Sequence, residues 1–289
     1  MKLKPYLLLI PGVGTIALLM GSALYVVIAQ SFGAFSLTGE TNPTLEYWQT
    51  TLNDPVLWRS VGYSLRTSIL GTLGAVAFAY PIALWLQKEV PGKPAIIGVL
   101  RAPMFVPGLV AAFLLMNVIA YHGIFNELLL LMGVIDKPLR LANDKFGWSI
   151  VVLQIWKNLP FALILITGAI ASIRTDLLDA ALDLGATRWS RFRNIIFPLT
   201  IPALQAASIL VFIGALGDFS FAAVAGSRSS YSLAMLMNIT ATQYYEWENS
   251  AVIAMVIMIL AAISAVVLTL LTQPFSTRKK PVISLEASK

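Results

Sequence analysis

Cysteine is absent from this 289-residue sequence, histidine occurs once, and charged residues make up only 12% of it. The lack of cysteine excludes disulfides, thiolate metal sites, iron–sulfur clusters and cysteine nucleophiles. The single histidine, His122, leaves no histidine cluster for a metal or for acid–base catalysis. Because soluble domains usually carry about 25% charged residues, the shortage of charge argues against an ordinary soluble domain.

Hydrophobic residues take the place of the missing charge. They form 58% of the sequence, and the mean hydropathy is +0.80. A chain of this size cannot hide so much apolar surface from water. The composition therefore disfavours a soluble enzyme, a disordered chain and a free nucleic-acid-binding protein. It predicts that lipid surrounds most of the molecule.

Six apolar stretches are long enough to cross a hydrocarbon core about 30 Å thick, which requires about 20 helical residues. They cover residues 6–29, 61–86, 95–121, 147–173, 200–226 and 250–272. No alternating pattern of barrel strands occurs. The sequence therefore predicts an all-α, polytopic integral membrane protein with six transmembrane helices in a single domain, residues 1–289. Kinks are predicted where prolines interrupt these helices, at Pro11, Pro81, Pro103, Pro107 and Pro160.

The first apolar stretch follows Lys2 and Lys4, an arrangement that also occurs in signal peptides. The apolar region of a signal peptide has about 7–15 residues, and residues 6–29 form a longer one. This length favours an uncleaved membrane anchor over a signal peptide.

Lysine and arginine are unequally divided between the two sides of the membrane. If the N-terminus lies inside, the larger group is cytoplasmic: Lys2, Lys4, Lys88, Lys93, Arg174, Arg188, Arg191, Arg193, Arg278, Lys279, Lys280 and Lys289. The smaller group lies outside: Arg59, Lys137, Arg140, Lys145 and Arg228. The positive-inside rule then places both termini in the cytoplasm. The net charge of +6 follows from this topology, and a nucleic-acid partner is not needed to explain it.

The cytoplasmic segment 174–198, between the fourth and fifth spans, has the pattern of two short helices. Asp176 is expected to cap the first helix, Gly185 to end it, and Thr187 to cap the second. Pro198 is expected to end the unit. Apolar stripes at helical spacing and a rim of arginines fit two interpretations equally: a helix lying on anionic lipid, or a docking element for a cytoplasmic partner.

Within this segment Asp179, Ala180 and Ala181 are followed at fixed spacing by Gly185, Ile195 and Pro198. The pattern resembles the EAA motif of permease subunits of binding-protein-dependent type I ABC importers, with aspartate in place of glutamate. Residues 6–11 look like the first span of these permeases, and residues 45–47, 53–57 and 63–68 are similar to the segment that leads into their second span. Residues 183–186 and 217–219 look most like the polyamine, ferric-iron, thiamine and phosphonate importers.

The resemblance implies the type I permease fold in the bacterial cytoplasmic (inner) membrane. It also implies a transmembrane subunit that forms half of the pathway for a small polar solute. The implied partners are two ABC ATP-binding subunits, a second permease subunit, identical or homologous, and an extracytoplasmic substrate-binding protein. Residues implied in coupling to the ATPases are Asp179, Ala180, Ala181, Gly185, Arg188 and Pro198.

The chain itself is expected to be no enzyme and to hold no cofactor, because ATP and magnesium would bind to the partner subunits. Gly92 and Lys93 are followed by Pro94, and so they lack the glycine spacing and the hydroxyl residue of a phosphate loop.

Ionisable residues inside membrane spans are costly and indicate function by default. Lys157 and Asp218 lie roughly 15 and 12 Å from the ends of their spans at helical rise, and so at similar depth. They are predicted to pair, directly or through Asn158, or both to line the translocation path; a role in neither stays open. Arg66 and Arg101 lie nearer the span ends and are expected to anchor at the interface.

Two other classes of protein remain as alternatives. An ion-gradient-driven secondary transporter or channel would need no ATPase, but no internal repeat supports an inverted-repeat transporter. A membrane-embedded enzyme would need a histidine cluster, paired carboxylates or an activated serine within the spans, and the sequence has none.

Overall fold

The computed structural model describes residues 4–36, 39, 41–227 and 230–276, with side chains described between residues 9 and 272 of these ranges. Within them the regular structure is helical, apart from one β-bridge between Ser227 and Ser230. The α-helices are α1 (Lys4–Ser31), α2 (Glu46–Asn53), α3 (Pro55–Trp85), α4 (Lys93–Arg101), α5 (Gly108–Ile119), α6 (Ile124–Leu131), α7 (Trp148–Ala171), α8 (Thr175–Asp183), α9 (Arg188–Arg191), α10 (Phe197–Leu216), α11 (Ser220–Ala225), α12 (Leu233–Thr242) and α13 (Trp247–Ser276). A 3-10 turn, η1 (Ala102–Phe105), and a π-helical turn, η2 (Phe192–Ile196), join neighbouring helices.

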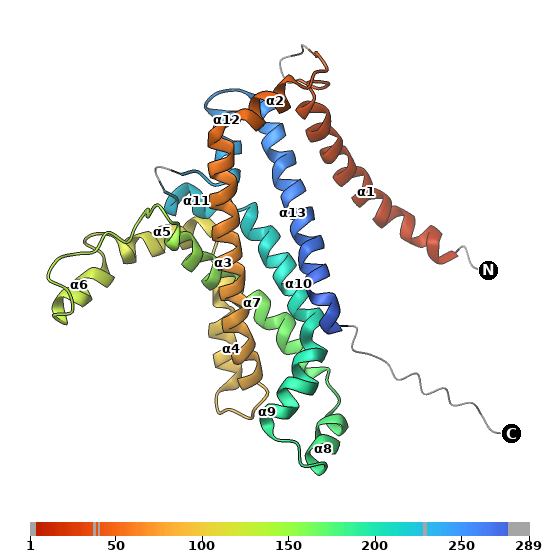
Figure 1. Ribbon diagram of the computed structural model, residues 1–289, viewed down its shortest axis with the longest axis vertical. Helices are drawn as coiled ribbons and strands as arrows, with labels where there is room; N and C mark the ends of the chain where they lie inside the picture. Colours follow the sequence, from red (N-terminus) through yellow and green to blue (C-terminus); the bar gives the residue numbers. More distant parts are fainter. Residues whose placement is uncertain (1–3, 37–38, 40, 228–229, 277–289) are drawn as a thin grey trace.

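Six helical segments of the described chain are long and apolar enough to cross a membrane, which confirms the predicted number of spans. They are Leu9–Ser31, Pro55–Trp85, Gly108–Leu131, Trp148–Ala171, Arg188–Leu216 and Trp247–Thr272. Helices α3, α7, α10 and α13 form the central bundle in Figure 1, where α8 and α9 lie at one end and α2 and α12 at the other.

The third span departs from the prediction of one helix over residues 95–121, which is wrong. Helix α4 ends at Arg101, η1 follows, and α5 begins only at Gly108. Between them Val106 and Pro107 take extended ψ angles of 121° and 144°. Pro107 has no N–H to donate to the carbonyl of Pro103, and its ring disfavours the helical conformation at Val106, which is extended here. In contrast, Pro11, Pro81 and Pro160 lie inside unbroken helices.

The fifth span also differs from its predicted limits, residues 200–226. Helical structure begins earlier, at Arg188, and α10 ends at Leu216. A separate short helix, α11, starts at Ser220, and the Asp218 carboxylate accepts a hydrogen bond from the N–H of Phe221 at 2.7 Å. The break therefore lies at Gly217 and Asp218, and the carboxylate of Asp218 accepts a hydrogen bond from an N–H group in the first turn of α11.

Two hydrophobic clusters succeed each other along α3 and α7. The α5–α11 cluster is formed by Tyr63, Ala111, Ala112, Ile150, Leu153, Phe221, Ala222 and Ala225. The α4–η2 cluster is formed by Ala79, Ala83, Leu86, Ala162, Leu163, Ile166, Ile170 and Ala207, with Ile96, Ile97 and Leu100 of α4 and Ile196 of η2 packed against it. The breaks in the third and fifth spans lie between the two clusters.

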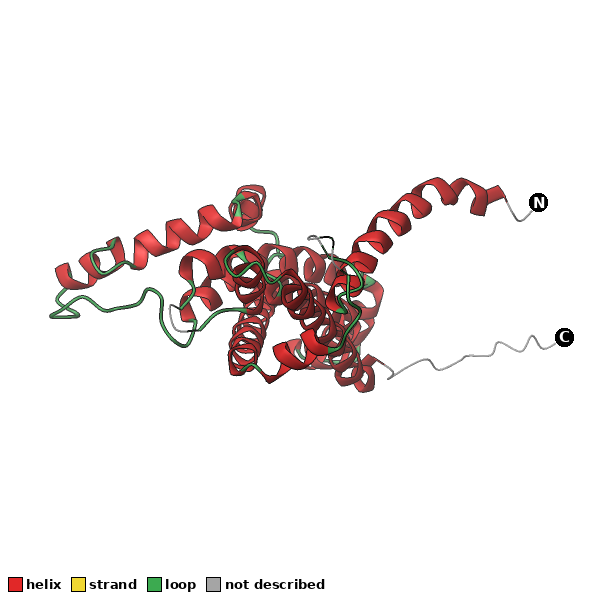
Figure 2. Cartoon of the chain, turned by 90° about the horizontal axis from the view of Figure 1, so that it is seen from above, coloured by secondary structure: helices red, strands yellow, loops and turns green. Residues whose placement is uncertain are grey.

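Helix α1 leans away from the bundle (Figures 1 and 2), and its side chains are exposed throughout residues 9–25. The first turn of α1 and the last turn of α13 both point away from α2 and α12 (Figure 1). The cytoplasmic location of the termini stays a prediction. Part of the charge pattern behind it lies outside the described residues: Lys2, Arg228, Arg278, Lys279, Lys280 and Lys289.

Candidate functional site

Residues 174–198 form a helical elbow beyond the ends of α7 and α10 (Figure 1). The turn of the elbow is made by Gly185, whose φ is +79°, a left-handed value that favours glycine. The N–H of Gly185 donates to the carbonyl of Leu182 at 2.8 Å, and the N–H of Ala186 donates to that of Ala181 at 2.9 Å. These two bonds define a Schellman motif and confirm that Gly185 ends the first helix.

The second arm of the elbow begins at Thr187, as predicted: its hydroxyl oxygen accepts a hydrogen bond from the N–H of Ser190 at 3.2 Å. The prediction that Pro198 ends the unit is wrong, because the helix runs on through η2 into α10. Pro198 lies in the first turn of α10, directly after a π-helical turn in which the N–H of Phe197 bonds to the carbonyl of Phe192. This wider turn accommodates the proline, which supplies no N–H.

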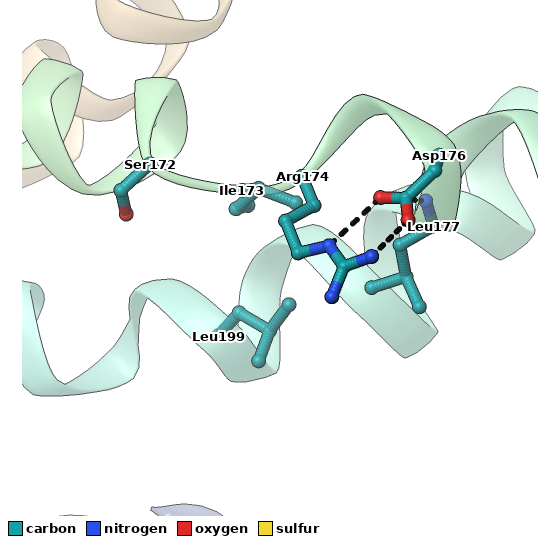
Figure 3. Close-up of a pocket in the computed structure, with 6 residues that line it drawn as sticks. All are labelled: Ser172, Ile173, Arg174, Asp176, Leu177 and Leu199. Atoms are coloured by element: carbon teal, nitrogen blue, oxygen red, sulfur yellow. Dashed lines mark hydrogen bonds and ion pairs between the residues drawn. The ribbon is translucent and has the colours of Figure 1, made fainter.

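Asp176 does not cap α8, which corrects a second prediction. The helix begins one residue earlier, at Thr175, so that Arg174 occupies the capping position and Asp176 lies in the first turn. The guanidinium of Arg174 pairs with the Asp176 carboxylate, with 3.0 Å between Nε and Oδ1 (Figure 3). The pair borders an open pocket of about 420 Å³, whose remaining lining is Ser172, Ile173, Leu177 and Leu199.

The first arm of the elbow offers apolar side chains to its surroundings. Helix α8 has no buried residue. Leu184, at the end of the first arm, is 88% exposed, and Trp189, at the start of the second arm, is 67% exposed. The residues that the resemblance implies in ATPase coupling differ in exposure. Ala181 and Pro198 are half-buried, and the others are exposed: Asp179, Ala180, Gly185 and Arg188.

Aromatic contacts attach the second arm to the bundle. Trp189 stacks on Phe192, with ring centroids 5.3 Å apart. Phe192 and Phe197 both lie against the ring of Tyr80 in α3, at 6.0 and 6.2 Å. The Tyr80 hydroxyl is hydrogen-bonded to the hydroxyl of Thr200 at 2.8 Å. The elbow therefore combines a free first arm with a second arm fixed to α3 and α10. Sequence reasoning missed Tyr80, because nothing in the sequence relates it to a segment over 100 residues away.

Lys157 lies in the middle of α7 and bonds to the broken third span. Its ammonium donates to the carbonyl oxygens of Pro103 and Met104, at 2.9 and 3.1 Å, and to that of Val106. The side-chain amide of Asn158 donates within its own helix, to the carbonyl and the side-chain oxygen of Gln154.

The predicted direct pair of Lys157 and Asp218 is not formed. In the part of the chain that the structure describes, the close contacts between acidic and basic side chains are His122 with Glu127, at 3.9 Å, and the ion pair of Arg174 with Asp176. Lys157 is bound instead to carbonyls at the break between α4 and α5, and the amide of Asn158 bonds within α7 rather than to Asp218. Arg66 stacks on Phe146, with 4.3 Å to the ring centroid, as an anchor would.

Residues 68–277 match the family model of the binding-protein-dependent transport system inner membrane component. The chain belongs to this family. It is a permease subunit of a type I ABC importer, a transport component rather than a catalyst, and a multi-pass protein of the inner membrane.

Individual relatives agree with this identification. The permease is 28% identical over 220 residues to the spermidine/putrescine transport system permease protein PotB of Escherichia coli K12, covering 75% of this chain and 79% of the relative. A bacterial ABC transporter involved in alginate import has the same fold, with a TM-score of 0.78 at 16% identity over 93% of this chain and 94% of the other. The MetNI methionine transporter matches with a TM-score of 0.56 at 17% identity, covering 76% of this chain and 96% of the other.

Proposed function

We propose that this permease forms half of the translocation pathway of an ATP-driven importer for a small polar solute of the polyamine class. The observation that carries the proposal is the elbow, in which an exposed apolar arm continues into an arm clasped to the bundle. The relatives named as spermidine/putrescine permeases support the choice of solute class.

The elbow has the properties of a coupling helix, which is typical of the family. Leu184 and Trp189 would seat in a groove of an ABC ATP-binding subunit, because water-exposed apolar side chains of this size usually mark a protein contact. Gly185 would set the angle of the seated arm. Arg188, at the start of the second arm, would pair with acidic groups of that subunit. Motion of the seated arm would reach α3 and α10 through the contacts of Tyr80.

Three kinds of further subunit complete the proposed importer. Two ATP-binding subunits would bind ATP and magnesium, a second permease subunit would form the other half of the path, and an extracytoplasmic binding protein would deliver the solute. The alginate transporter, which has the same fold, has been solved with a ligand-bound periplasmic protein. In this arrangement both termini of the permease would lie in the cytoplasm.

Asp218 gives the proposed pathway a negative charge. Its carboxylate is half-buried at the break between α10 and α11 and accepts a hydrogen bond from Phe221 through Oδ1. A carboxylate at membrane depth favours a cation over an anion of similar size. This charge would suit the ammonium groups of a polyamine.

Uptake into proteoliposomes tests the proposal. The permease would be purified together with its ATP-binding subunits and second permease, reconstituted, and supplied with binding protein and labelled spermidine. We expect uptake that requires ATP on the side of the elbow and stops when the ATP-binding subunits are omitted. Uptake by this chain alone under an ion gradient would instead support a secondary transporter or channel, the alternative that family membership disfavours.

A further inference from the structure

The break between α4 and α5 interrupts the regular helical pairing of its backbone carbonyls: Pro103 accepts instead from the N–H of Val106, at 3.3 Å, in the 3-10 turn. In an unbroken helix the carbonyl of Pro103 would accept from the N–H of residue 107, but that residue is a proline. The backbone of Val106 is extended, and so the helical hydrogen-bond pattern ends at this residue. Irregular backbone inside a membrane is tolerated only where protein or water satisfies its polar groups. A further donor at this point would therefore stabilise the break.

Lys157 is that donor. An ammonium group has three N–H donors, and the three carbonyl oxygens of Pro103, Met104 and Val106 accept from it. These acceptors lie more than 50 residues earlier in the chain, and so the contact joins two different spans. We call Lys157 with these three carbonyls the Lys157 site.

The Lys157 site lies at the boundary between the two hydrophobic clusters. On one side α4 packs on the α4–η2 cluster, which includes Ile196 of the elbow's second arm. On the other side α5 belongs to the α5–α11 cluster. A Cβ atom added at Gly108 would come within 3.0 Å of Ser220, which shows how closely the start of α5 lies against α11. The two halves of the third span are thus attached to different parts of the molecule.

We propose that Lys157 is a positioning residue for transport: it holds the third span in two segments, so that α4 follows the elbow while α5 stays with α11. The proposal rests on the proposed function, because it assigns the motion of α4 to ATP-driven movement of the elbow. The ammonium stabilises the open break without fixing the angle between the segments, since a flexible lysine side chain can follow the carbonyls.

The test uses the full importer complex with spin labels on the two segments. Val99 of α4 and Phe113 of α5 are 74% and 58% exposed, and the permease has no cysteine, so that cysteines introduced at these two positions are its only thiols. Thiols in the partner subunits would be removed. Pulsed electron paramagnetic resonance then measures the distance between the labels without nucleotide and with ATP trapped in the complex.

Lys157→Met removes the donors and keeps the length of the side chain. We expect the nucleotide-dependent shift in distance to disappear in Lys157→Met and to persist in Lys157→Arg, which keeps N–H donors. Spermidine uptake per ATP hydrolysed should fall at least about tenfold in Lys157→Met, the size of an ordinary coupling effect. Lys137→Met, at an exposed loop lysine, is the matched control and should leave both quantities unchanged. A normal distance shift in Lys157→Met would overturn the proposal.

A second variant keeps the test decisive if Lys157→Met does not assemble. Adding Pro107→Ala restores an N–H that can bond to the Pro103 carbonyl within a continuous helix. We expect the double variant to assemble but to show neither the distance shift nor uptake, because its third span is one rigid helix. Normal uptake by the double variant would contradict the proposal. If the unmodified complex shows the distance shift but takes up no spermidine, the proposed solute is wrong and the role of Lys157 stands.

Discussion

The elbow and the Lys157 site both interrupt the helical bundle, but the chain satisfies their backbone groups in opposite ways. The elbow uses neighbours in sequence: Gly185 bonds to Leu182, and Thr187 accepts from Ser190. The Lys157 site uses a side chain more than 50 residues from its acceptors. The elbow lies outside the bundle, where water and a partner can complete it, whereas a break within lipid must be completed by the chain itself. The bonds of the elbow are therefore local, whereas the break between α4 and α5 receives its donor from another helix.

Of the substitutions that test this comparison between the elbow and the Lys157 site, the largest effect is expected at Leu184. Leu184→Asp should reduce the affinity for the ATP-binding subunits by about a hundredfold, the loss typical of an interface hot spot. The thermal stability of the isolated permease should not change, because this side chain is 88% exposed. Pull-down titration and thermal unfolding measure the two quantities. Leu45→Asp, at a 59% exposed leucine near α2, is the control. A large fall in thermal stability with unchanged affinity would mean that the elbow, like the Lys157 site, serves the stability of the bundle rather than docking.

Asp218 should show a smaller effect that is confined to the pathway. Asp218→Asn keeps an acceptor for the N–H of Phe221 but loses the charge, so that the KM for spermidine should rise roughly thirtyfold, for a loss of about 2 kcal/mol. Binding of the ATP-binding subunits should stay normal. An unchanged KM would show that the solute does not meet this carboxylate.

A double-mutant cycle separates Asp218 from Lys157. Because the structure holds no direct ion pair between them, the losses in stability of Asp218→Ala and Lys157→Ala should add within about 0.5 kcal/mol. Chemical unfolding in detergent gives the four free energies of unfolding. A coupling well above that value would mean that the pair forms in another state of the transport cycle.

Gly185→Ala should destabilise the elbow by about 1–2 kcal/mol, the cost of a left-handed conformation for an L-residue. The change is local, because no atom lies within 4 Å of the added Cβ. Hydrogen exchange should therefore accelerate in α8 but not in α7. Gly98→Ala, where the added Cβ also meets no atom and φ is ordinary, is the matched control. Equal exchange rates in both variants would contradict a conformational role for Gly185.

The smallest effect is expected at the contact that joins the elbow to the bundle. Tyr80→Phe removes the hydrogen bond to Thr200 and keeps the ring against Phe192 and Phe197, so that it should cost about 1 kcal/mol of stability. Thermal unfolding measures this loss. Tyr80→Ala should cost more and should also lower uptake per ATP, because the aromatic contacts transmit the motion of the elbow. Equal effects of the two variants would mean that the ring carries no coupling.

Features that depend on nearby residues were predicted well. The six spans follow from the length of apolar runs, and the roles of Gly185 and Thr187 follow from residue type and spacing. Asp176 was misplaced because Arg174, two residues away, forms an ion pair with it and the helix starts one residue earlier. The breaks at residues 102–107 and 217–219 lie inside long apolar stretches, so that hydropathy alone could not separate the helices on either side.

The sequence by itself determined that lipid surrounds this protein, how many helices cross the membrane and where the elbow turns. These features depend on composition and on neighbours within a few residues. The tertiary structure alone decided which groups satisfy Lys157 and which helices share a cluster. A side-chain donor bonds to whichever acceptors the fold brings within about 3 Å. The packing of α7 beside the break between α4 and α5 places the carbonyls of that break, rather than Asp218, next to Lys157.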